Sequence, residues 1–309
     1  MLDATPKAFF HLIARSGALK KLASRYGMRK PTSFARRFIA GETVEEAIEA
    51  AARVERGGCL QTLDYLGEAV ASLAEADAAT REYLRIIDAI IASGIGRNLS
   101  LKLTQLGLDV DRASAVDNLR KILASAEGFF VRIDMESSGY TDVTLDAFAT
   151  LWQQGYHQIG VVLQADLHRT EQDVRRITSL GARIRLVKGA YREPRSVAYQ
   201  HKSDVDAAYA RLIKILLTEG TYPAIATHDP AMIDLTRRFA IDHQIGADRF
   251  EFQMLYGIRR DLQTALVNEG YRVRVYIPFG RQWFPYFMRR LGERPANVAF
   301  VLRGILAER

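Results

Sequence analysis

Cysteine is almost absent from this chain of 309 residues, since Cys59 is its one representative. A single cysteine excludes an internal disulfide and any metal site built from several cysteines. It also fits the reducing interior of a cell, where structural disulfides are rare. We therefore expect a cytoplasmic protein with no metal centre.

Long apolar runs and several common active-site signatures are also missing. No run reaches the roughly 18 apolar residues of a membrane-spanning helix, and no secretory segment is visible. The chain has no P-loop, no HExxH and no GxSxG pattern. Gly94 and Gly96 supply two glycines of a dinucleotide fingerprint, but they precede a predicted strand and the third glycine is missing. These absences exclude a Rossmann-type nucleotide site.

Positive charge is concentrated at the N-terminus. Residues 1–40 hold nine Lys or Arg and one acid, Asp3, whereas the other 269 residues hold 34 basic and 35 acidic side chains. Such a start resembles a transit peptide, but helical apolar spacing through Phe9, Leu12 and Ile13 favours a helical arm with a basic face. A basic face of this kind can bind anionic lipid or an acidic partner. We predict peripheral contact with the inner face of a membrane and, without a recognised motif, no binding of nucleic acid.

Short β-like runs alternate with helical segments after residue 56, and 48% hydrophobic content is enough for a large core. The predicted strands are Cys59–Leu66, Leu99–Leu103, Phe129–Ile133, Ile159–Leu163, Arg183–Val187, Ala224–Thr227, Phe250–Met254 and Arg272–Ile277. The predicted helices between them include Val116–Ala124, Leu145–Gln154, Glu171–Leu180, Val205–Leu217, Ala231–His243 and Arg259–Glu269. Eight such units predict a closed (β/α)8 barrel, with an open doubly wound sheet as the alternative.

Residues 1–56 are predicted to form an N-terminal helical arm, and residues 57–309 the barrel, within one domain overall. The arm is expected to contain a helix up to about Arg29 and a second element from Thr32 to Glu55. Thr43-Val44-Glu45-Glu46 has the capping-box pattern that opens a helix.

Reactive side chains follow the predicted strands. Catalytic groups of a barrel lie at the carboxyl ends of its strands, and so many charges in one barrel mouth are costly to bury without a ligand. Taken singly, each has an ordinary structural explanation: Gly189 suits a turn, and His228 can be a core histidine. The residues at these positions are Lys102, Thr104, Asp134, Glu136, Gln164, Asp166, His168, Arg169, Arg185, Lys188, Gly189, Ala190, Tyr191, Thr227, His228, Asp229, Glu251, Gln253 and Tyr276.

One predicted helix near the C-terminus carries a polar stripe where core residues normally lie. Tyr286, Arg289, Arg290 and Glu293 have i, i+3, i+4, i+7 spacing, and Pro285 and Pro295 are suited to begin and end the helix. Two adjacent guanidiniums repel unless an anion lies between them, and their planar forks match a carboxylate. The stripe predicts a clamp for a small anion; a solvated helix face with an Arg–Glu pair is the alternative.

At these positions the chain resembles the proline dehydrogenase (proline oxidase) family, from about Arg36 to Arg303. The most specific similarities are at 185–191 (RLVKGAY), at 251–255 (EFQML) and in the closing stripe from Tyr286 to Glu293. The stretches 100–104, 163–165 and 227–228 are also similar, and 62–68 matches more loosely. Family members commonly have Asn where this chain has Asp229.

The resemblance implies a distorted (β/α)8 barrel that holds FAD non-covalently, with a last helix over the barrel mouth. It implies oxidation of L-proline to Δ1-pyrroline-5-carboxylate, by hydride transfer from proline carbon 5 to flavin N5. This is the first step of proline catabolism to glutamate. Electrons then pass to a quinone or a similar acceptor. The length matches the monofunctional bacterial type, because 309 residues leave no room for a second enzyme.

The resemblance also implies roles for individual residues. Asp134 and Arg185 are the expected catalytic residues, with Asp134 organising the charges beside the substrate. The expected substrate-binding residues are Lys102, Leu255, Tyr276, Tyr286, Arg289, Arg290 and Glu293. The expected cofactor-binding residues are Met135, Gln164 and Arg185, the last two at the flavin ring, and Lys188, Gly189, Ala190, Thr227 and His228 along the ribityl and phosphate part.

Two other functions fit parts of the pattern. A barrel lyase or aldolase would form a Schiff base on Lys188 or Lys102. A basic adaptor with no catalytic activity is disfavoured by the charged strand ends. No residue is an obvious general base for the substrate amine, and its deprotonation by solvent is compatible with the sequence.

Overall fold

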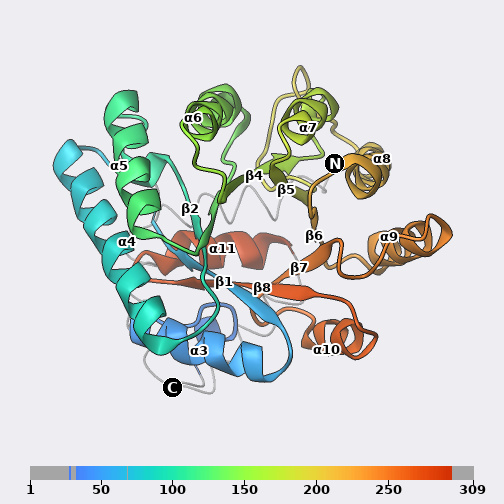
Figure 1. The fold of residues 1–309 in the computed structure, drawn as a ribbon, viewed down its shortest axis with the longest axis horizontal. Coiled ribbons are helices and arrows are strands. Elements are labelled where there is room, and N and C mark those ends of the chain that lie inside the picture. The colour runs from blue at the N-terminus through green and yellow to red at the C-terminus, as the bar shows by residue number, and fades with distance from the viewer. Residues whose placement is uncertain (1–27, 29–32, 68, 294–309) are drawn as a thin grey trace, which may run out of the picture.

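Eight parallel strands close into a barrel in the computed structural model, which describes residues 28, 33–67 and 69–293 (Figure 1). The strands are β1 (Leu60–Tyr65), β2 (Asn98–Leu101), β3 (Phe130–Ile133), β4 (Ile159–Gln164), β5 (Arg183–Val187), β6 (Ala224–Ala226), β7 (Glu251–Leu255) and β8 (Val273–Phe279). The ring closes where β1 pairs with β8, from Leu60 opposite Arg274 to Tyr65 opposite Phe279. The predicted (β/α)8 barrel is therefore confirmed, and so are its eight strands.

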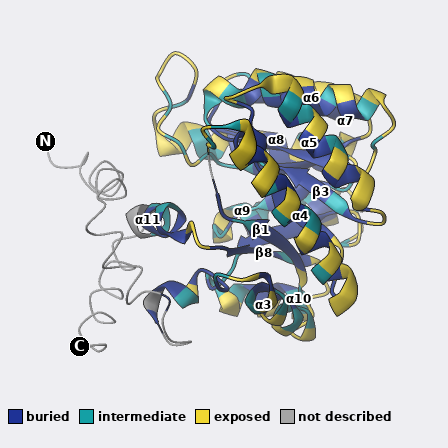
Figure 2. Cartoon of the chain, turned by 90° about the vertical axis from the view of Figure 1, so that its left-hand side faces the viewer, coloured by how far each residue is buried: buried dark blue, intermediate teal, exposed yellow. Residues whose placement is uncertain are grey.

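Helices follow the strands, and those from α4 to α10 cover the outside of the ring. They are α4 (Leu73–Ser93), α5 (Arg112–Ser125), α6 (Thr141–Gln153), α7 (Thr170–Ser179), α8 (Lys202–Glu219), α9 (Pro230–Asp242) and α10 (Arg260–Asn268), with short 3-10 turns η2 (Thr104–Leu106) and η3 (Ser138–Tyr140). The last helix, α11 (Trp283–Glu293), follows β8. Figure 2 shows the buried strands enclosed by helices whose outer faces are exposed. Alternation predicted a helix between the first two strands without naming its range; this helix is α4, in which Tyr83, Ile86, Ile87 and Ile90 have helical core spacing and are buried.

The predicted element from Thr32 to Glu55 is wrong as a single unit. The structure has a 3-10 turn, η1 (Phe34–Arg37), and a separate helix, α3 (Val44–Arg56). Between them Ala40 N donates to Pro278 O, and Gly280 N donates to Gly41 O. These bonds to the end of β8 stabilise a non-helical path, which local helical propensity does not reveal.

Helix α3 begins at the predicted capping box, since Thr43 accepts from Glu46 N and the Glu46 carboxylate accepts from Thr43 N. It packs against β1 and β8 on the outside of the barrel. Residues 1–27 and 29–32, which hold the first predicted helix of the arm, lie outside the described residues. The boundary between arm and barrel stays a prediction.

Helix α11 lies across the barrel end at which β8 finishes, as two perpendicular views show (Figures 1 and 2). It begins at Trp283 and not at the predicted Pro285. Pro285 is its third residue, within the first turn, where a backbone N–H has no partner inside the helix. The predicted stop at Pro295 lies outside the described residues.

Two apolar clusters support this arrangement. The larger lies between the strands and the surrounding helices. The smaller joins α11 to the N-terminal segment and consists of Met28, Ala35, Phe38, Ile39, Leu66, Trp283, Phe284, Tyr286, Phe287 and Met288. Trp283 also donates from Nε1 to Glu42 Oε1 at 3.0 Å. Helix α11 is therefore attached mainly through the N-terminal segment, which places it above the strand ends.

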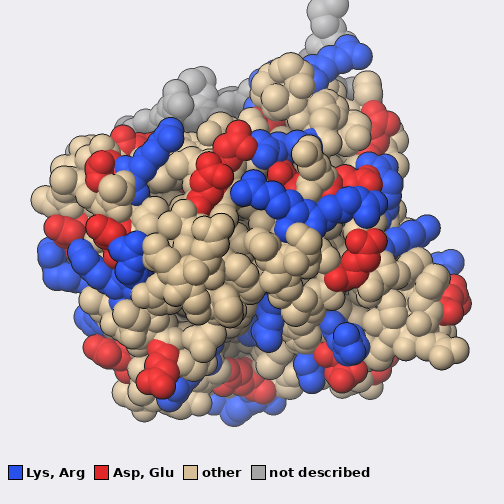
Figure 3. All heavy atoms as spheres, turned by 45° about the horizontal axis from the view of Figure 1, so that its top comes forward, with Lys and Arg blue, Asp and Glu red and all other residues tan. Residues whose placement is uncertain are grey.

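The surface of the barrel carries interspersed charges. Figure 3 shows Lys and Arg side chains alternating with Asp and Glu around a central uncharged area. No helix in the described part of the chain is long and apolar enough to cross a membrane.

Candidate active site

Arg185 is at the centre of the barrel interior. Its Nε donates to Gln253 Oε1 at 2.5 Å, its Nη1 to Asp134 Oδ1 at 2.7 Å and its Nη2 to Ser100 Oγ at 3.0 Å. Because β5 pairs only with β4 and β6, bonds to residues on or just after β2, β3 and β7 must cross the interior. Three acceptors on three sides fix the plane of the guanidinium, whose donors have a rigid geometry.

Asp134 joins Arg185 to the opposite wall. Its second oxygen, Oδ2, accepts from the Tyr276 hydroxyl at 2.7 Å, and the Arg185 guanidinium lies 5.3 Å from the centre of the Tyr276 ring. Burial, and then the charges of Asp134 and Asp64, hold the pKa of Tyr276 well above its usual range. Tyr276 is therefore a neutral donor at physiological pH. Asp134, Arg185 and Tyr276 were each predicted as site residues, and they meet in space although Asp134 and Tyr276 are 142 positions apart.

Lys102 forms a second buried ion pair at the same end of the barrel. Its Nζ lies 3.2 Å from Asp64 Oδ1 and 3.9 Å from Asp134 Oδ2. Asp64 is fully buried, and burial is the main reason that its pKa lies above the ordinary value; Asp134 raises it further and Lys102 opposes the shift. Asp64 was not among the predicted site residues, although it lies in the loosely similar stretch 62–68 near the end of a predicted strand.

A further charged layer lies beneath Arg185. Gln253 donates from Nε2 to Glu251 Oε1 at 2.5 Å, and Glu251 accepts two bonds from Arg274, at 2.7 and 2.9 Å. Arg132 is also buried there and donates from Nη1 to the backbone oxygen of Arg183 at 2.9 Å. Arg274 and Arg132 were not predicted as site residues, because their inward direction depends on the barrel register.

Gln164 presents a buried acceptor at the rim. Its Nε2 donates to the backbone oxygen of Glu136 at 3.1 Å, which fixes the orientation of the amide. Its Oε1 is buried and has no hydrogen-bond partner in the described structure. A buried acceptor without a donor is costly, so this oxygen fits a ligand that carries an N–H group. Met135, also predicted at the cofactor, is buried beside Glu136.

Lys188 is held by two carboxylates. Its Nζ donates to Asp206 Oδ1 at 2.5 Å and to Asp229 Oδ2 at 2.7 Å. Asp229 also accepts from Ala231 N at the start of α9, and the bond from Lys188 holds the pKa of Asp229 below its ordinary value. The aspartate that departs from the family pattern is therefore a helix cap and a counter-ion of Lys188.

Position 189 requires glycine because of its own backbone conformation and its neighbour Asp166. Its φ is +119°, and a Cβ at this position would lie 2.0 Å from Asp166 Oδ2. A left-handed backbone next to a carboxylate requires glycine whether or not a ligand binds. The side chain of Ala190 is exposed beyond it. The absence of a Cβ at Gly189 is thus no independent sign of a phosphate.

His228 and Thr227 organise the neighbouring strand ends. Leu255 N donates to His228 Nε2 at 2.9 Å, so the imidazole proton resides on Nδ1. Thr227 is buried, and its Oγ1 accepts from Asp229 N at 3.1 Å. This arrangement brings the end of β6 to Leu255, which is predicted to contact the substrate.

Helix α11 places part of its predicted stripe at the mouth. Tyr286 is buried within the smaller apolar cluster, and the Arg290 guanidinium lies 5.3 Å from the centre of its ring. Arg289 and Arg290 are half-buried, so they do not lie on a fully solvated face. Nothing is described of the Glu293 side chain.

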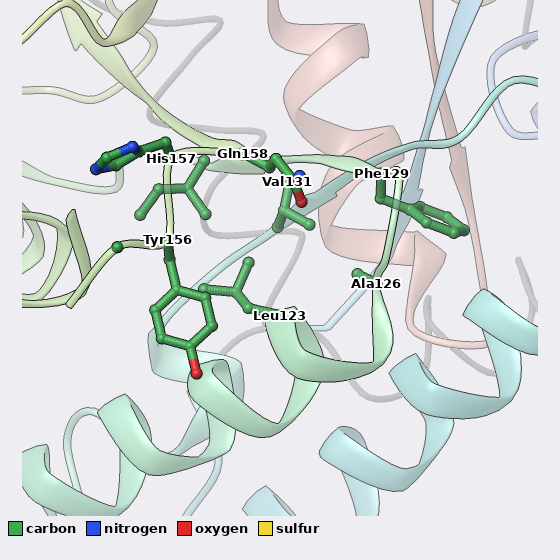
Figure 4. Close-up of a pocket in the computed structure, with 9 residues that line it drawn as sticks. Leu123, Ala126, Phe129, Val131, Tyr156, His157 and Gln158 are labelled. Carbon is green, nitrogen blue, oxygen red and sulfur yellow. The ribbon is translucent and has the colours of Figure 1, made fainter.

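A separate cavity of about 320 Å³ lies at the opposite end of the barrel, near the starts of β3 and β4 (Figure 4). It is lined by Leu123, Ala126, Phe129, Val131, Gly155, Tyr156, His157, Gln158 and Ile159. None of these residues was predicted to act in catalysis or binding. In the described ranges no group of three or more His, Cys, Asp or Glu side chains could hold a metal ion.

Other proteins share this sequence and fold. A sequence model described as "Proline dehydrogenase" matches residues 47–303. "Proline dehydrogenase 1" of Bacillus subtilis (strain 168) is 45% identical over 299 residues, which cover 96% of this chain and 98% of the relative. "Proline dehydrogenase" of Deinococcus radiodurans is 43% identical over 312 residues, which cover 99% of each chain.

Solved structures of longer proteins contain the same fold. The structure of proline utilization A (PutA) from Bdellovibrio bacteriovorus inactivated by N-propargylglycine superposes with a TM-score of 0.80 at 27% identity. The similarity covers 92% of this chain and 34% of that one, so this chain spans about a third of the longer protein. The match over 257 residues of sequence, together with relatives of nearly equal length, shows that the chain belongs to the proline dehydrogenase family.

Proposed function

We infer that this chain oxidises L-proline to Δ1-pyrroline-5-carboxylate with FAD bound non-covalently. The observation that carries this inference is the interior cluster of Asp134, Arg185, Tyr276 and Lys102 at the carboxyl end of the barrel. Barrel enzymes perform their chemistry at this end. A cluster of paired charges there, in a chain of this family, supports a site for a small zwitterion.

The substrate carboxylate is proposed to bind between Lys102 and the two arginines of α11. Lys102 is 7% exposed, and Arg289 and Arg290 are half-buried. Cations that are partly removed from water attract an anion more strongly than exposed ones, and a guanidinium also orients the carboxylate it binds. Glu293 is proposed to orient these arginines. Leu255, Tyr276 and Tyr286 are proposed to pack against the pyrrolidine ring.

The residues predicted at the flavin fit its chemistry. The buried Oε1 of Gln164 needs a donor, and the oxidised isoalloxazine ring carries one N–H. Arg185 brings a fixed positive charge, which favours a ring that gains negative charge on reduction. Met135, Lys188, Gly189, Ala190, Thr227 and His228 are proposed to line the rest of the cofactor. When bound, the flavin supplies the acceptor for the hydride that leaves proline carbon 5.

Asp134 and Arg185 have complementary catalytic roles in this proposal. Loss of a hydride leaves positive charge on the pyrroline nitrogen, and the Asp134 carboxylate can stabilise that charge. Arg185 and Tyr276 hold the carboxylate from two sides, at 2.7 Å each. A group held this firmly needs little reorganisation during the reaction.

The Schiff-base alternative is disfavoured by the partners of both candidate lysines. Lys188 donates to Asp206 and Asp229, and Lys102 lies between Asp64 and Asp134. Formation of a Schiff base needs a neutral amine, which such sites provide by desolvation or by a neighbouring cation. Both lysines instead lie in ion pairs with two carboxylates, and neither has a neighbouring cation of this kind among the contacts described.

The electron acceptor is proposed to be a quinone, reached at the inner face of a membrane through the basic N-terminus. The support for this is the net charge of the first 40 residues beside a nearly neutral remainder. Anionic lipid attracts such a segment by about 1 kcal/mol per basic residue near the surface.

An anaerobic absorption spectrum tests the function. The purified protein should show flavin bands that fall when L-proline is added, and Δ1-pyrroline-5-carboxylate should accumulate when a dye acceptor is present. Acid precipitation should release the colour into the supernatant. Colour that stays in the pellet would contradict non-covalent binding, and a borohydride-trapped adduct on Lys102 or Lys188 without flavin would support the lyase instead.

A further inference from the structure

We propose that Asp64 is a positioning residue for the substrate carboxylate, which it serves by holding Lys102. This inference rests on the proposed function, because it assumes that Lys102 binds the carboxylate. Asp64 itself does not contact the substrate. It fixes where the Lys102 ammonium lies and provides its counter-charge.

Asp64 and Lys102 differ in how close they lie to the barrel mouth. Asp64 is 0% exposed and lies within β1, where it pairs with Ser100 of β2 and Pro278 of β8. Lys102 follows β2 directly and is 7% exposed. A ligand that enters from the mouth therefore meets Lys102 before Asp64. The carboxylate of Asp64 can influence such a ligand only through its neighbours.

The contacts of Asp64 direct that influence to Lys102. Its two oxygens lie 3.2 and 3.5 Å from Lys102 Nζ, while Asp134 Oδ2 is farther, at 3.9 Å. Asp134 has two closer donors, Arg185 and Tyr276, at 2.7 Å each. Lys102 is a flexible side chain with rotatable donors, so its position depends on the partner that holds it. Of Asp64 and Asp134, Asp64 is the nearer partner of Lys102.

A purely structural ion pair would be a poor explanation for this arrangement. Burying two charges is expensive, and replacement of a buried pair by apolar residues is often neutral or stabilising. A wholly buried acid next to a lysine at a barrel mouth is better explained if the lysine must stay charged and in place.

Several groups set the protonation of Asp64. Facing it are Lys102 after β2, Asp134 after β3, Tyr276 on β8 and Tyr83 on α4. Burial is the main cause that raises the pKa of Asp64, Asp134 adds to the shift, and Lys102 reduces it. Asp64 should then take up a proton at a higher pH than an exposed aspartate. A protonated Asp64 no longer holds the Lys102 ammonium in place, so carboxylate binding should weaken on the acid side.

The first test is Asp64→Asn, which keeps the shape and removes the charge. We expect KM for proline to rise about tenfold or more, equivalent to the loss of about one charged contact, with a smaller change in kcat. Cyclopentanecarboxylate, which has the carboxylate without the amine, should lose inhibitory affinity by a similar factor. Pyrrolidine, which has the amine without the carboxylate, should not. The acid limb of kcat/KM should move to lower pH, because the titrating carboxyl is gone.

Asp173→Asn is the matched control. Asp173 is also a buried acid, 4% exposed; it lies on α7 and accepts two bonds from Arg169, the residue that precedes this helix. Its loss should lower stability and leave KM, inhibitor affinities and the pH profile unchanged. If Asp64→Asn behaved like this control, with lower stability and the same KM, Asp64 would be structural and the proposal would fail.

A double-mutant cycle with Lys102→Met gives a test that does not need the single Asp64 variant to fold. Removing both members leaves no unpaired buried charge, so the double variant should be more stable than the single Asp64 variant. If Asp64 acts through Lys102, then Lys102→Met and Asp64→Asn/Lys102→Met should have equal KM values for proline. A further rise in the double variant would overturn the proposal.

The wild-type protein separates this inference from the function on which it rests. Failure of the wild type to oxidise proline would overturn the proposed function. Turnover by the wild type, combined with an unchanged carboxylate affinity in Asp64→Asn, would overturn only the role of Asp64.

Discussion

Tyr276 donates a hydrogen bond from its hydroxyl to Asp134 Oδ2 at 2.7 Å, although the two residues are 142 positions apart. The other oxygen of the same carboxylate accepts from Arg185 at 2.7 Å. One carboxylate thus fixes an aromatic ring and a guanidinium, each from a different strand. The geometry of the proposed substrate site depends on this junction more than on any single residue.

Tyr276→Phe should weaken that junction without removing the ring. A hydrogen bond to a charged group contributes about 1.5–3 kcal/mol, so kcat/KM for proline should fall roughly ten- to a hundredfold. Steady-state kinetics with a dye acceptor measure this. Tyr140→Phe is the matched control, because its hydroxyl donates to the exposed Asp109 at 3.0 Å, and it should leave kcat/KM near the wild-type value. Equal kinetics in both variants would contradict the role of Tyr276.

Replacement of Arg289 or Arg290 by Met should reduce proline affinity. Each change removes a charge-assisted contact of about 1.5–3 kcal/mol, so KM should rise roughly ten- to a hundredfold while flavin content stays the same. Lysine should restore little, because a point charge does not reproduce the planar fork. Arg238→Met on α9 is the control, as its side chain is 78% exposed. A wild-type KM in both α11 variants would contradict the proposed binding of the substrate carboxylate by Arg289 and Arg290.

Glu251→Gln should make the free energy of unfolding less dependent on pH. Burial raises the pKa of Glu251, but the Arg274 charge and hydrogen bonds outweigh it, so the pKa lies below the ordinary value. A lowered pKa stabilises the fold above the unfolded-state pKa, and this stabilisation is lost as the pH falls through the folded-state pKa. Breaking such a buried pair costs about 3–5 kcal/mol.

Urea unfolding of wild type and Glu251→Gln at several pH values measures this difference. The difference in free energy of unfolding between the wild type and Glu251→Gln should be largest near neutral pH and should become smaller in acid. Glu171→Gln is the control, because the Glu171 side chain is 35% exposed in its pairs with Arg175 and Arg211. If Glu251→Gln lowered the free energy of unfolding by the same amount at all pH values, the charge of Glu251 would not be the cause of the lower stability.

Lys188→Met should weaken flavin binding. If Lys188 contacts the cofactor, loss of one charged contact should raise the Kd of FAD about tenfold, as measured by flavin fluorescence titration of the apoprotein. Lys202→Met is a close control, since Lys202 pairs with the same Asp206 but its side chain is 79% exposed. An unchanged Kd for Lys188→Met would place Lys188 outside the cofactor site.

Removal of residues 1–29 should separate membrane contact from chemistry. Binding to anionic liposomes at low salt should fall, because most of the basic excess is removed, and salt should weaken the binding of the full chain as well. Dye-linked turnover of proline should be largely retained. A folded truncated protein without turnover would show that the segment contributes to the active site.

The sequence by itself determined the eight strands and the positions at which reactive residues follow them. Arg183–Val187 was predicted with the bounds that the structure gives, and the other strand predictions differ by a few residues at their ends. This was possible because buried parallel strands are short apolar runs between polar segments, a local property that needs no knowledge of contacts. Alternation with helices then limits the fold to very few arrangements.

Only the tertiary structure decided which polar side chains meet. Asp64, Gln253 and Arg274 face the interior because closure of the barrel fixes the register of β1, β7 and β8, and a shift of one residue would turn each outward. The break between Phe34–Arg37 and Val44–Arg56 likewise depends on bonds to the distant end of β8. Ion pairs and hydrogen bonds between strands far apart in sequence leave no local pattern, so the partners of Lys102, Asp134 and Lys188 came from the fold alone.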